Sequence, residues 1–346
     1  MKAIGYYKNL SADDPSALVD LELPAPVATG HDLLVEVRAV AVNPVDTKLR
    51  RNRAPADGKA DVLGYDAAGI VRAVGDKASL FKVGDAVFYA GDFTRPGSNA
   101  ELQLVDERIV GRKPATLDFA SAAALPLTAI TAWELLFDRM QLPRNQPARN
   151  GDAPRPQENL LIVGGAGGVG SIMIQLARLL TPLNVIATAS RPESAAWCRD
   201  LGAHLVIDHT KPLAEELRRN GIESVNCIAS LTNTNQYFTS YVDIIAPQGK
   251  LGVIDDLQDP IDVRLLKAKC ASFHWEFMFV RPAFKTHDIL AQHDILTQVA
   301  DLIDAGELRS THGKTLGKIN AENLRHAHQL QESGHTIGKI VLENFV

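Results

Sequence analysis

The chain is poor in cysteine and shows no strong excess of either charge. Only Cys198, Cys227 and Cys270 occur among its 346 residues. So few and so widely spaced, they argue against a disulfide framework and suit a reducing cytoplasm. The formal net charge is −5 and no Lys/Arg block is present, so the sequence gives no electrostatic support for nucleic-acid binding.

Long apolar runs are also missing. We find no stretch as long as a membrane span requires. The first residues are typical of a β-strand rather than a signal peptide, because no long apolar core follows them. We therefore expect no membrane partner and a cytoplasmic location. With 46% hydrophobic and 22% charged residues, the composition is that of an ordinary soluble protein long enough for two domains.

The first third of the chain is predicted to be rich in β-structure. Alternating or β-branched runs bounded by glycine or aspartate indicate strands at 33–42, 69–75 and 85–89. Residues 120–137 read as a helix with a break at Leu125-Pro126. Residues 143–158 contain four prolines and are predicted to be a solvated loop.

From Asn159 onwards strands and helices alternate. Strands are predicted at 160–163, 185–189, 205–207, 225–228 and 250–254, with helices that include 195–201 and 213–220. This rhythm favours an α/β fold with a parallel sheet covered on both faces. Residues 270–279 alternate as a strand with one apolar face, which either pairs with a second subunit or lies inside the core. Helices at 296–304 and 321–331 and a strand at 339–342 complete the chain.

The most informative segment is the glycine-rich run at 160–170. Gly165, Gly167 and Gly170 fit the pattern G-x-G-x-x-G between an apolar strand and a helical stretch. One glycine allows the tight turn, one lets the backbone approach a pyrophosphate, and one lets the helix pack close to the strand. Amides at the helix start then hold the negative charge. We predict a dinucleotide site here that also includes Ala166, Gly168 and Val169.

The end of the second strand indicates which dinucleotide binds. An acidic residue at this point would bond the ribose 2′-hydroxyl of NAD. The chain has Ser190-Arg191 instead, and an arginine can hold a 2′-phosphate through two parallel hydrogen bonds. We therefore predict NADPH. Ser190 also fits the N-cap of a capping box with Glu193, and the two roles can coexist.

Several motifs together resemble one known family, the medium-chain dehydrogenase/reductase superfamily. The chain looks like its zinc-independent quinone oxidoreductase branch, in a subgroup often labelled zinc-type alcohol dehydrogenase-like. The resemblance covers nearly the whole chain. It rests on Asn43-Pro44-Val45-Asp46, Gly64-Tyr65-Asp66-Ala67-Ala68-Gly69, Val83-Gly84-Asp85, Ala124-Leu125-Pro126, the glycine run, Gly202-Ala203, Val206-Ile207-Asp208, Ile245-Ala246-Pro247-Gln248-Gly249, His274-Trp275-Glu276-Phe277-Met278 and Gly338-Lys339-Ile340-Val341-Leu342.

The resemblance implies a doubly wound Rossmann domain inserted in a β-rich, GroES-like catalytic domain built from both chain ends. We place the catalytic domain at 1–127, the NADPH-binding domain at 128–273 and the return to the catalytic domain at 274–346. Homodimers are usual in such proteins.

The residues at the family's zinc positions argue against a metal. A catalytic zinc needs three ligands from cysteine, histidine and acidic side chains. Zinc-bearing relatives place cysteine where this chain has Asn43, and histidine and glutamate where it has Tyr65 and Asp66. Residues 1–197 contain no cysteine at all. We therefore predict no metal site.

Without a metal, a quinone or an α,β-unsaturated carbonyl is the better hydride acceptor, because donors at its oxygen can stabilise the developing charge. The resemblance implies that Asn43 contacts the nicotinamide or the substrate oxygen and that Asp46 orients Asn43 or a water. It makes Tyr65 a candidate hydrogen-bond donor. Asn43-Pro44 as a simple turn, and Tyr65 with Asp66 as a strand end, remain alternatives.

Further cofactor contacts are implied by the resemblance. Thr131 matches a residue that bonds the nicotinamide or the phosphates, and His209 matches an aromatic position beside the adenosine phosphate. Leu231 and Ile254 fall just past strand ends, where ligands sit in open α/β sheets. Lys339 either reaches a phosphate or is an ordinary surface lysine. The alternatives to a reductase are a zinc-dependent alcohol dehydrogenase and a non-catalytic NADPH-binding protein.

Overall fold

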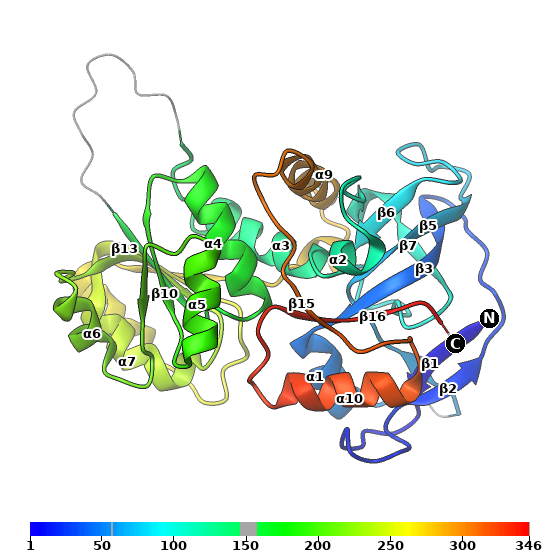
Figure 1. Cartoon of the computed structure of the whole chain (residues 1–346), viewed down its shortest axis with the longest axis horizontal. Coiled ribbons are helices and arrows are strands. Elements are labelled where there is room, and N and C mark those ends of the chain that lie inside the picture. The colour runs from blue at the N-terminus through cyan, green and yellow to red at the C-terminus, as the bar shows by residue number, and fades with distance from the viewer. Residues whose placement is uncertain (57, 146–157, 346) are drawn as a thin grey trace. The chain divides into compact units, whose positions relative to one another are not determined.

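The computed structural model describes residues 1–56, 58–145 and 158–345. The chain divides into two units, which we describe separately. Unit 1 comprises Met1–Ile130 and Met278–Val346, so it holds both chain ends (Figure 1). Unit 2 comprises Thr131–Phe277. Most of the predicted solvated loop, residues 146–157, lies outside the described residues.

Unit 1 is the β-rich part, as the N-terminal strand patterns predict. In its larger sheet the strands lie in the order β15 (His312–Thr315), β16 (Lys339–Glu343), β3 (Asp32–Val42), β5 (Ala67–Val74), β6 (Ala86–Tyr89) and β8 (Val110–Arg112), while β7 (Leu102–Asp106) also pairs with β3. A smaller sheet has the order β2 (Val19–Glu22), β1 (Lys2–Tyr6), β4 (Asp61–Val62). The closing strand β16 runs antiparallel to β3, which joins the C-terminal segment to the N-terminal domain.

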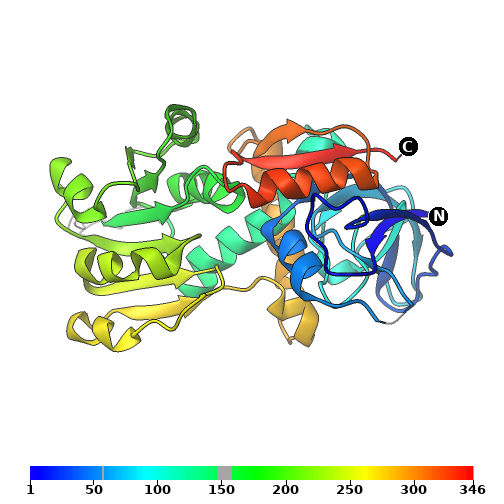
Figure 2. The ribbon, with the colours of Figure 1, turned by 90° about the horizontal axis from the view of Figure 1, so that it is seen from below.

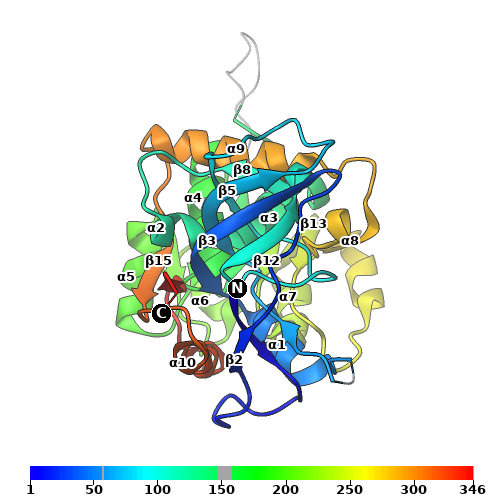
Figure 3. The same ribbon diagram turned by 90° about the vertical axis from the view of Figure 1, so that its right-hand side faces the viewer.

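Unit 1 also contains several helices. They are α1 (Pro44–Asn52), α2 (Phe119–Ala123), α8 (Val280–Phe284), α9 (Ala291–Asp304) and α10 (Ala321–Glu332), with a 3-10 turn η1 (Glu107–Ile109). Figure 2 shows α10 alongside β16, and Figure 3 shows α9 across β8. The strand β3 lies at the centre of this unit, and its buried residues Val35, Val37 and Val40 form part of the core.

Unit 2 contains an all-parallel sheet. Among the described residues its strands lie in the order β11 (Leu205–Ile207), β10 (Asn184–Thr188), β9 (Asn159–Val163), β12 (Val225–Ser230), β13 (Ile245–Val253) and β14 (Ser272–Trp275). Within this sheet the first strand along the chain is β9, and β10 and β11 extend the sheet on one side of it. The chain then returns, and β12, β13 and β14 extend the sheet on the other side. Right-handed crossovers therefore place α4 (Gly168–Leu180) and α5 (Pro192–Asp200) on one face and α7 (Thr234–Ile244) on the other. This is the doubly wound order of the Rossmann fold, so the predicted fold class is confirmed.

The remaining elements of unit 2 are α6 (Leu213–Arg219) and the 3-10 helix η3 (Val263–Lys269). One prediction here is wrong in extent. The strand expected over 270–279 is only β14, which lies at an edge of the sheet and pairs with β13. Trp275 and Phe277 are about half exposed, at 53% and 46%, so this segment is not an internal core strand.

The long apolar helical stretch is broken where proline predicts. The helix α2 ends at Ala123, α3 (Pro126–Trp133) starts at the proline, and a π-helical turn, η2 (Glu134–Arg139), follows. Residues 119–139 are long and apolar enough to cross a membrane by length and composition, which the sequence inspection overlooked. However, most of this stretch is buried inside the protein, as in a core helix.

Candidate active site

The glycine turn in unit 2 is fixed onto the end of the neighbouring strand. Gly164 follows β9 with a φ of +89°, a left-handed conformation that favours glycine. Its N–H donates to Oγ1 of Thr188 at 3.1 Å, and the N–H of Gly165 donates to the Thr188 carbonyl at 3.2 Å. Sequence reasoning missed Thr188. Its place as the last residue of β10, next to the predicted turn, is the signal that could have found it.

The three fingerprint glycines differ in what a side chain would meet. A Cβ on Gly165 would lie 2.8 Å from Cβ of Ala187, and one on Gly170 would lie 2.4 Å from the Gly164 carbonyl oxygen. At Gly167 the nearest atom is 3.5 Å away, an ordinary contact. The first and third glycines therefore serve packing, whereas the space over Gly167 is left open by the described residues.

This open space lies at the start of α4. Gly167 is the N-cap, and no side chain in the described ranges caps the helix. The first-turn amides, which include those of Gly168 and Val169, have no intrahelical acceptor. The carbonyl of Ala166 accepts a hydrogen bond from the hydroxyl of Ser171 at 3.3 Å, which ties the turn to α4. Open backbone with unpaired amides at a helix N-terminus fits the pyrophosphate of a dinucleotide.

Most of the predicted cofactor residues share one edge of the sheet. In a parallel sheet the carboxyl ends of all strands meet at the same edge. Ser190 and Arg191 follow β10, His209 follows β11, Leu231 follows β12 and Ile254 follows β13. The backbone N–H of Leu231 donates to Val163, the last residue of β9, so this loop starts beside the glycine turn. Thr131 differs, because it is a buried residue within α3.

The capping prediction at Ser190 is wrong by one residue. Arg191 is the N-cap of α5, since Pro192 has the φ value required at the first helical position. Ser194, not Glu193, completes the cap: its Oγ accepts from the Arg191 N–H at 3.3 Å and donates to the Arg191 carbonyl at 2.9 Å. Ser190 is exposed and precedes the helix, so helix capping does not occupy its hydroxyl.

His209 is half-buried at the same edge. Burial lowers the pKa of its imidazole, so the ring is neutral near pH 7. Its Nδ1 is buried and has no hydrogen-bond partner in the described part of the chain.

Unit 1 contains a second cluster, a buried polar network. Asn43, Asp66 and Lys339 are each at most 3% exposed. The Lys339 ammonium donates to Asp66 at 2.8 Å, to the Val42 carbonyl at 3.0 Å, and to Oδ1 of Asn43. The Asn43 amide donates to the same Asp66 oxygen at 2.9 Å. The other Asp66 oxygen accepts from the Leu127 N–H at 2.7 Å.

This network corrects the interpretation of Lys339. The side chain is not at the surface, and its three N–H groups all have protein acceptors, so none is left for a phosphate. Burial raises the pKa of Asp66, and the ammonium of Lys339 opposes that shift. The sequence analysis did not single out Asp66 as a partner of Lys339, because 273 residues separate them along the chain.

Asp46 links the start of α1 to the turn before Tyr65. One carboxylate oxygen accepts from the Asn43 N–H at 2.7 Å, and the other accepts from the Gly64 N–H at 3.2 Å. Asp46 therefore orients the backbone of Asn43 as a helix-capping residue. Burial raises its pKa to about 7, and the two backbone donors oppose the rise.

The raised pKa of Asp46 predicts a pH effect on stability. The native state holds the proton of the Asp46 carboxyl group more tightly than the unfolded chain does, because aspartates in the unfolded chain have a pKa of about 3.9. The stabilisation that comes from this tighter proton binding is complete below the pKa of the unfolded chain. It is lost as the pH rises through about 7. We expect wild type to lose stability relative to Asp46→Asn over this window, by at most about 1.4 kcal/mol per pH unit. Urea unfolding of both proteins at several pH values measures the difference, and parallel curves would contradict it.

Tyr65 lies buried beside the network. Its hydroxyl oxygen accepts from an Arg53 N–H at 3.1 Å, and its ring meets Phe279 edge-on with centroids 5.5 Å apart. Burial raises the pKa of the phenol above its ordinary value, and Arg53 opposes the shift. Tyr65 thus keeps its proton at neutral pH, with Arg53 occupying an oxygen lone pair rather than the O–H. Arg53 itself is held by Asp61 at 2.7 Å, a role that sequence reasoning did not find.

Among the described residues no group of three histidine, cysteine or acidic side chains could hold a metal ion.

Comparisons with known proteins agree with this geometry. Residues 29–115 match the family model of the alcohol dehydrogenase GroES-like domain, and residues 201–342 match that of the zinc-binding dehydrogenases. Over 342 residues the chain is 38% identical to the zinc-type alcohol dehydrogenase-like protein of Staphylococcus epidermidis, covering 99% of both chains. The chain belongs to the medium-chain dehydrogenase/reductase superfamily. Members of this superfamily are oxidoreductases that use a nicotinamide dinucleotide.

Solved structures give the same result for this superfamily member. A putative zinc-dependent alcohol dehydrogenase from Rhizobium etli superposes with a TM-score of 0.94 at 54% identity, covering 100% of this chain and 98% of that one. The Escherichia coli quinone oxidoreductase complexed with NADPH has a TM-score of 0.80, with 99% and 100% of the two chains covered. Its identity is 23%, which supports the shared fold only.

Proposed function

We propose that this superfamily member is an NADPH-dependent reductase that transfers hydride to quinones or α,β-unsaturated carbonyl compounds without a metal. The observation that carries the cofactor part is the open backbone at Gly167 beside a strand end that presents Ser190-Arg191 and no carboxylate. The turn would hold the pyrophosphate and Arg191 the 2′-phosphate. NADPH, when bound, supplies the hydride.

Arg191→Ala tests the choice of cofactor. We expect the KM for NADPH to rise roughly tenfold to hundredfold, because a charge-assisted pair with the 2′-phosphate contributes about 1.5–3 kcal/mol. The KM for NADH should change little, since NADH lacks that phosphate. Steady-state kinetics with both cofactors measures this. An equal effect on both would contradict the assignment.

The acceptor part of the proposal rests on the side chains of unit 1. Tyr65 offers an O–H group whose oxygen only accepts from Arg53, while the N–H groups of Asn43 and Lys339 are used within the buried network. A zinc site would instead need thiolate or imidazole ligands. An acceptor that takes hydride at a β-carbon or on a quinone ring develops negative charge on its oxygen. A protonated phenol such as that of Tyr65 can donate to that oxygen and lower the barrier. The Arg53 contact holds the phenol in one position.

Two relatives with shorter matches support this substrate class. The 2-methylene-furan-3-one reductase of Solanum lycopersicum is 35% identical over 227 residues, which is 63% of this chain and 54% of that protein. The NADPH-dependent alkenal/one oxidoreductase of Arabidopsis thaliana is 35% identical over 208 residues, or 58% and 50%. Both names describe reduction of conjugated carbonyl compounds.

Tyr65→Phe tests the proposed donor. We expect kcat for enones to fall about tenfold to a hundredfold with little change in the KM for NADPH, because the lost hydrogen bond acts on the developing charge. Turnover should be measured on enones and quinones side by side. Full turnover on both classes would exclude Tyr65 as the donor.

The function as a whole is tested by NADPH oxidation over a panel of quinones and enones, with the metal content of the same protein sample determined in parallel. Turnover of at least one class by metal-free protein is the expected result. Oxidation of simple alcohols that depends on one zinc per chain would favour the alcohol dehydrogenase instead.

We further propose that the protein is a homodimer joined through β14. This strand is an edge of the described sheet, and the adjoining Trp275 and Phe277 are about half exposed. Light scattering during size-exclusion chromatography gives the mass, and a monomer would contradict the proposal.

A further inference from the structure

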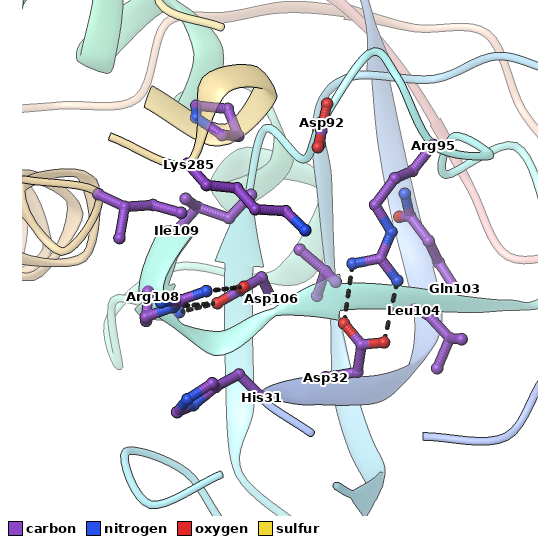
Figure 4. A pocket seen from close by; sticks show the side chains of 13 residues that line it. His31, Asp32, Asp92, Arg95, Gln103, Leu104, Asp106, Arg108, Ile109 and Lys285 are labelled. Atoms are coloured by element: carbon purple, nitrogen blue, oxygen red, sulfur yellow. Dashed lines mark hydrogen bonds and ion pairs between the residues drawn. The ribbon is translucent and has the colours of Figure 1, made fainter. Parts of the chain in front are cut away.

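Unit 1 contains a pocket separate from the network around Asn43. Its volume is about 350 Å³, within the range of roughly 300–1,000 Å³ typical of small-molecule sites. Its walls come from the start of β3, the loop after β6, the strand β7, the turn η1 and the segment from α8 to Ile289 (Figure 4).

Most of the charges in this pocket neutralise one another. Arg95 binds Asp32 through two hydrogen bonds of 2.8 and 3.0 Å. Arg108 binds Asp106 in the same two-pronged way, at 2.9 and 2.7 Å. The Nδ1 atom of His31 lies 3.0 Å from a carboxylate oxygen of Glu107. These pairs need no ligand to balance them.

One cation and one carboxylate are left over. The side chain of Lys285 has no hydrogen bond or ion pair with residues 1–56, 58–145 or 158–345. Figure 4 shows its ammonium directed into the space between the two arginine–aspartate pairs. Asp92 uses one carboxylate oxygen to accept from Thr94, and it forms no ion pair within 4 Å among the same residues. Lys285 and Asp92 therefore present opposite charges that do not pair with each other.

A glutamine with a buried side chain also lines the pocket. Gln103 lines the pocket and is only 5% exposed. Its Nε2 donates to the Pro96 carbonyl at 3.1 Å, but its Oε1 has no hydrogen-bond partner in the described part of the chain. This oxygen is shielded from solvent, so it does not contact a ligand in the pocket directly.

The rest of the lining is apolar. Leu104, Val105, Ile109 and Ile289 contribute aliphatic surface beside the polar groups. A ligand of matching chemistry has one anionic group, one cationic N–H donor and a short aliphatic side chain.

We propose that this pocket binds a small apolar α-amino acid in its zwitterionic form. The ligand carboxylate pairs with Lys285, and the ammonium group pairs with Asp92. A phosphate dianion fits less well, because Asp32, Asp92 and Asp106 also line the pocket and a second negative charge would face them. The site is distinct from the proposed cofactor and substrate sites, so it stands whether or not the reductase activity is found.

Isothermal titration calorimetry of the full chain with L-valine tests the proposal. N-acetyl-L-valine lacks the ammonium group and L-valinamide lacks the carboxylate, so each removes one half of the recognition. We expect L-valine to bind, and each analogue to bind at least about tenfold more weakly. No binding of L-valine, or equal binding of all three compounds, would overturn the proposal.

Two substitutions locate the binding on the protein. Lys285→Met keeps the aliphatic stem and removes the charge, and Asp92→Asn keeps the acceptor for Thr94. Each should weaken L-valine at least about tenfold. Lys314→Met, at an exposed lysine of β15 outside the pocket, should leave the affinity unchanged. Equal affinity in all three variants would place the ligand elsewhere and overturn the assignment.

Discussion

Replacement of Lys339 by methionine is expected to destabilise the protein by about 3–5 kcal/mol, the cost of breaking a buried ion pair by removing one partner. Asp66 would be left as a buried carboxyl group without its cationic partner, in a site with no solvent access. Asn43 would also lose the donor to its Oδ1. Thermal unfolding should show Tm lower by roughly 10 °C.

Two controls separate the ion pair from a general effect of losing a lysine. Lys314→Met removes an exposed lysine from β15, the strand paired with β16, and should leave Tm nearly unchanged. Adding Asp66→Asn to Lys339→Met removes the uncompensated charge and should recover part of the loss. If Lys339→Met unfolds like wild type, the 2.8 Å contact with Asp66 does not carry the stability assigned to it.

The substitution Gly167→Ala is expected to raise the Kd for NADPH about a hundredfold, or about 2.7 kcal/mol, while the protein stays folded. The backbone has a φ of −72°, which alanine adopts without strain. The added Cβ meets nothing closer than 3.5 Å in the described residues, so it extends into the space proposed for the pyrophosphate. The stability cost of alanine at an N-cap is about 1 kcal/mol or less.

Gly170→Ala is the matched comparison. Its Cβ would lie 2.4 Å from the Gly164 carbonyl oxygen, a backbone atom that cannot move aside cheaply. We expect a stability loss of about 2 kcal/mol or more from overpacking. Fluorescence titration with NADPH and thermal unfolding of both variants provide the two measurements. Unchanged affinity in Gly167→Ala would refute the proposed position of the pyrophosphate.

Much of unit 2 could be predicted because its signals are local. The apolar run before Gly164 and the glycines after it specify β9, the turn and α4 from neighbouring residues alone. The proline at 126 placed a helix break correctly, since proline cannot donate the helical hydrogen bond. Errors arose where two local signals competed. At Ser190 a capping pattern suggested one helix start, and Pro192 fixed another.

The network of unit 1 could not be predicted in the same way. Lys339 is an ordinary lysine until β16 pairs with β3 and brings it onto Asn43 and Asp66. The length of the strand at 270–279 was overestimated because alternation of apolar residues does not distinguish an edge strand from a turn that follows it.

The sequence by itself determined the alternation of strands and helices, the position of the glycine turn and the superfamily, since each depends on the order of neighbouring residues. Only the tertiary structure decided which buried charges meet, which glycine is left uncovered and which pocket residues remain unpaired. These features depend on contacts between segments far apart in the chain. Their energies are set by burial, which the type of a residue does not reveal.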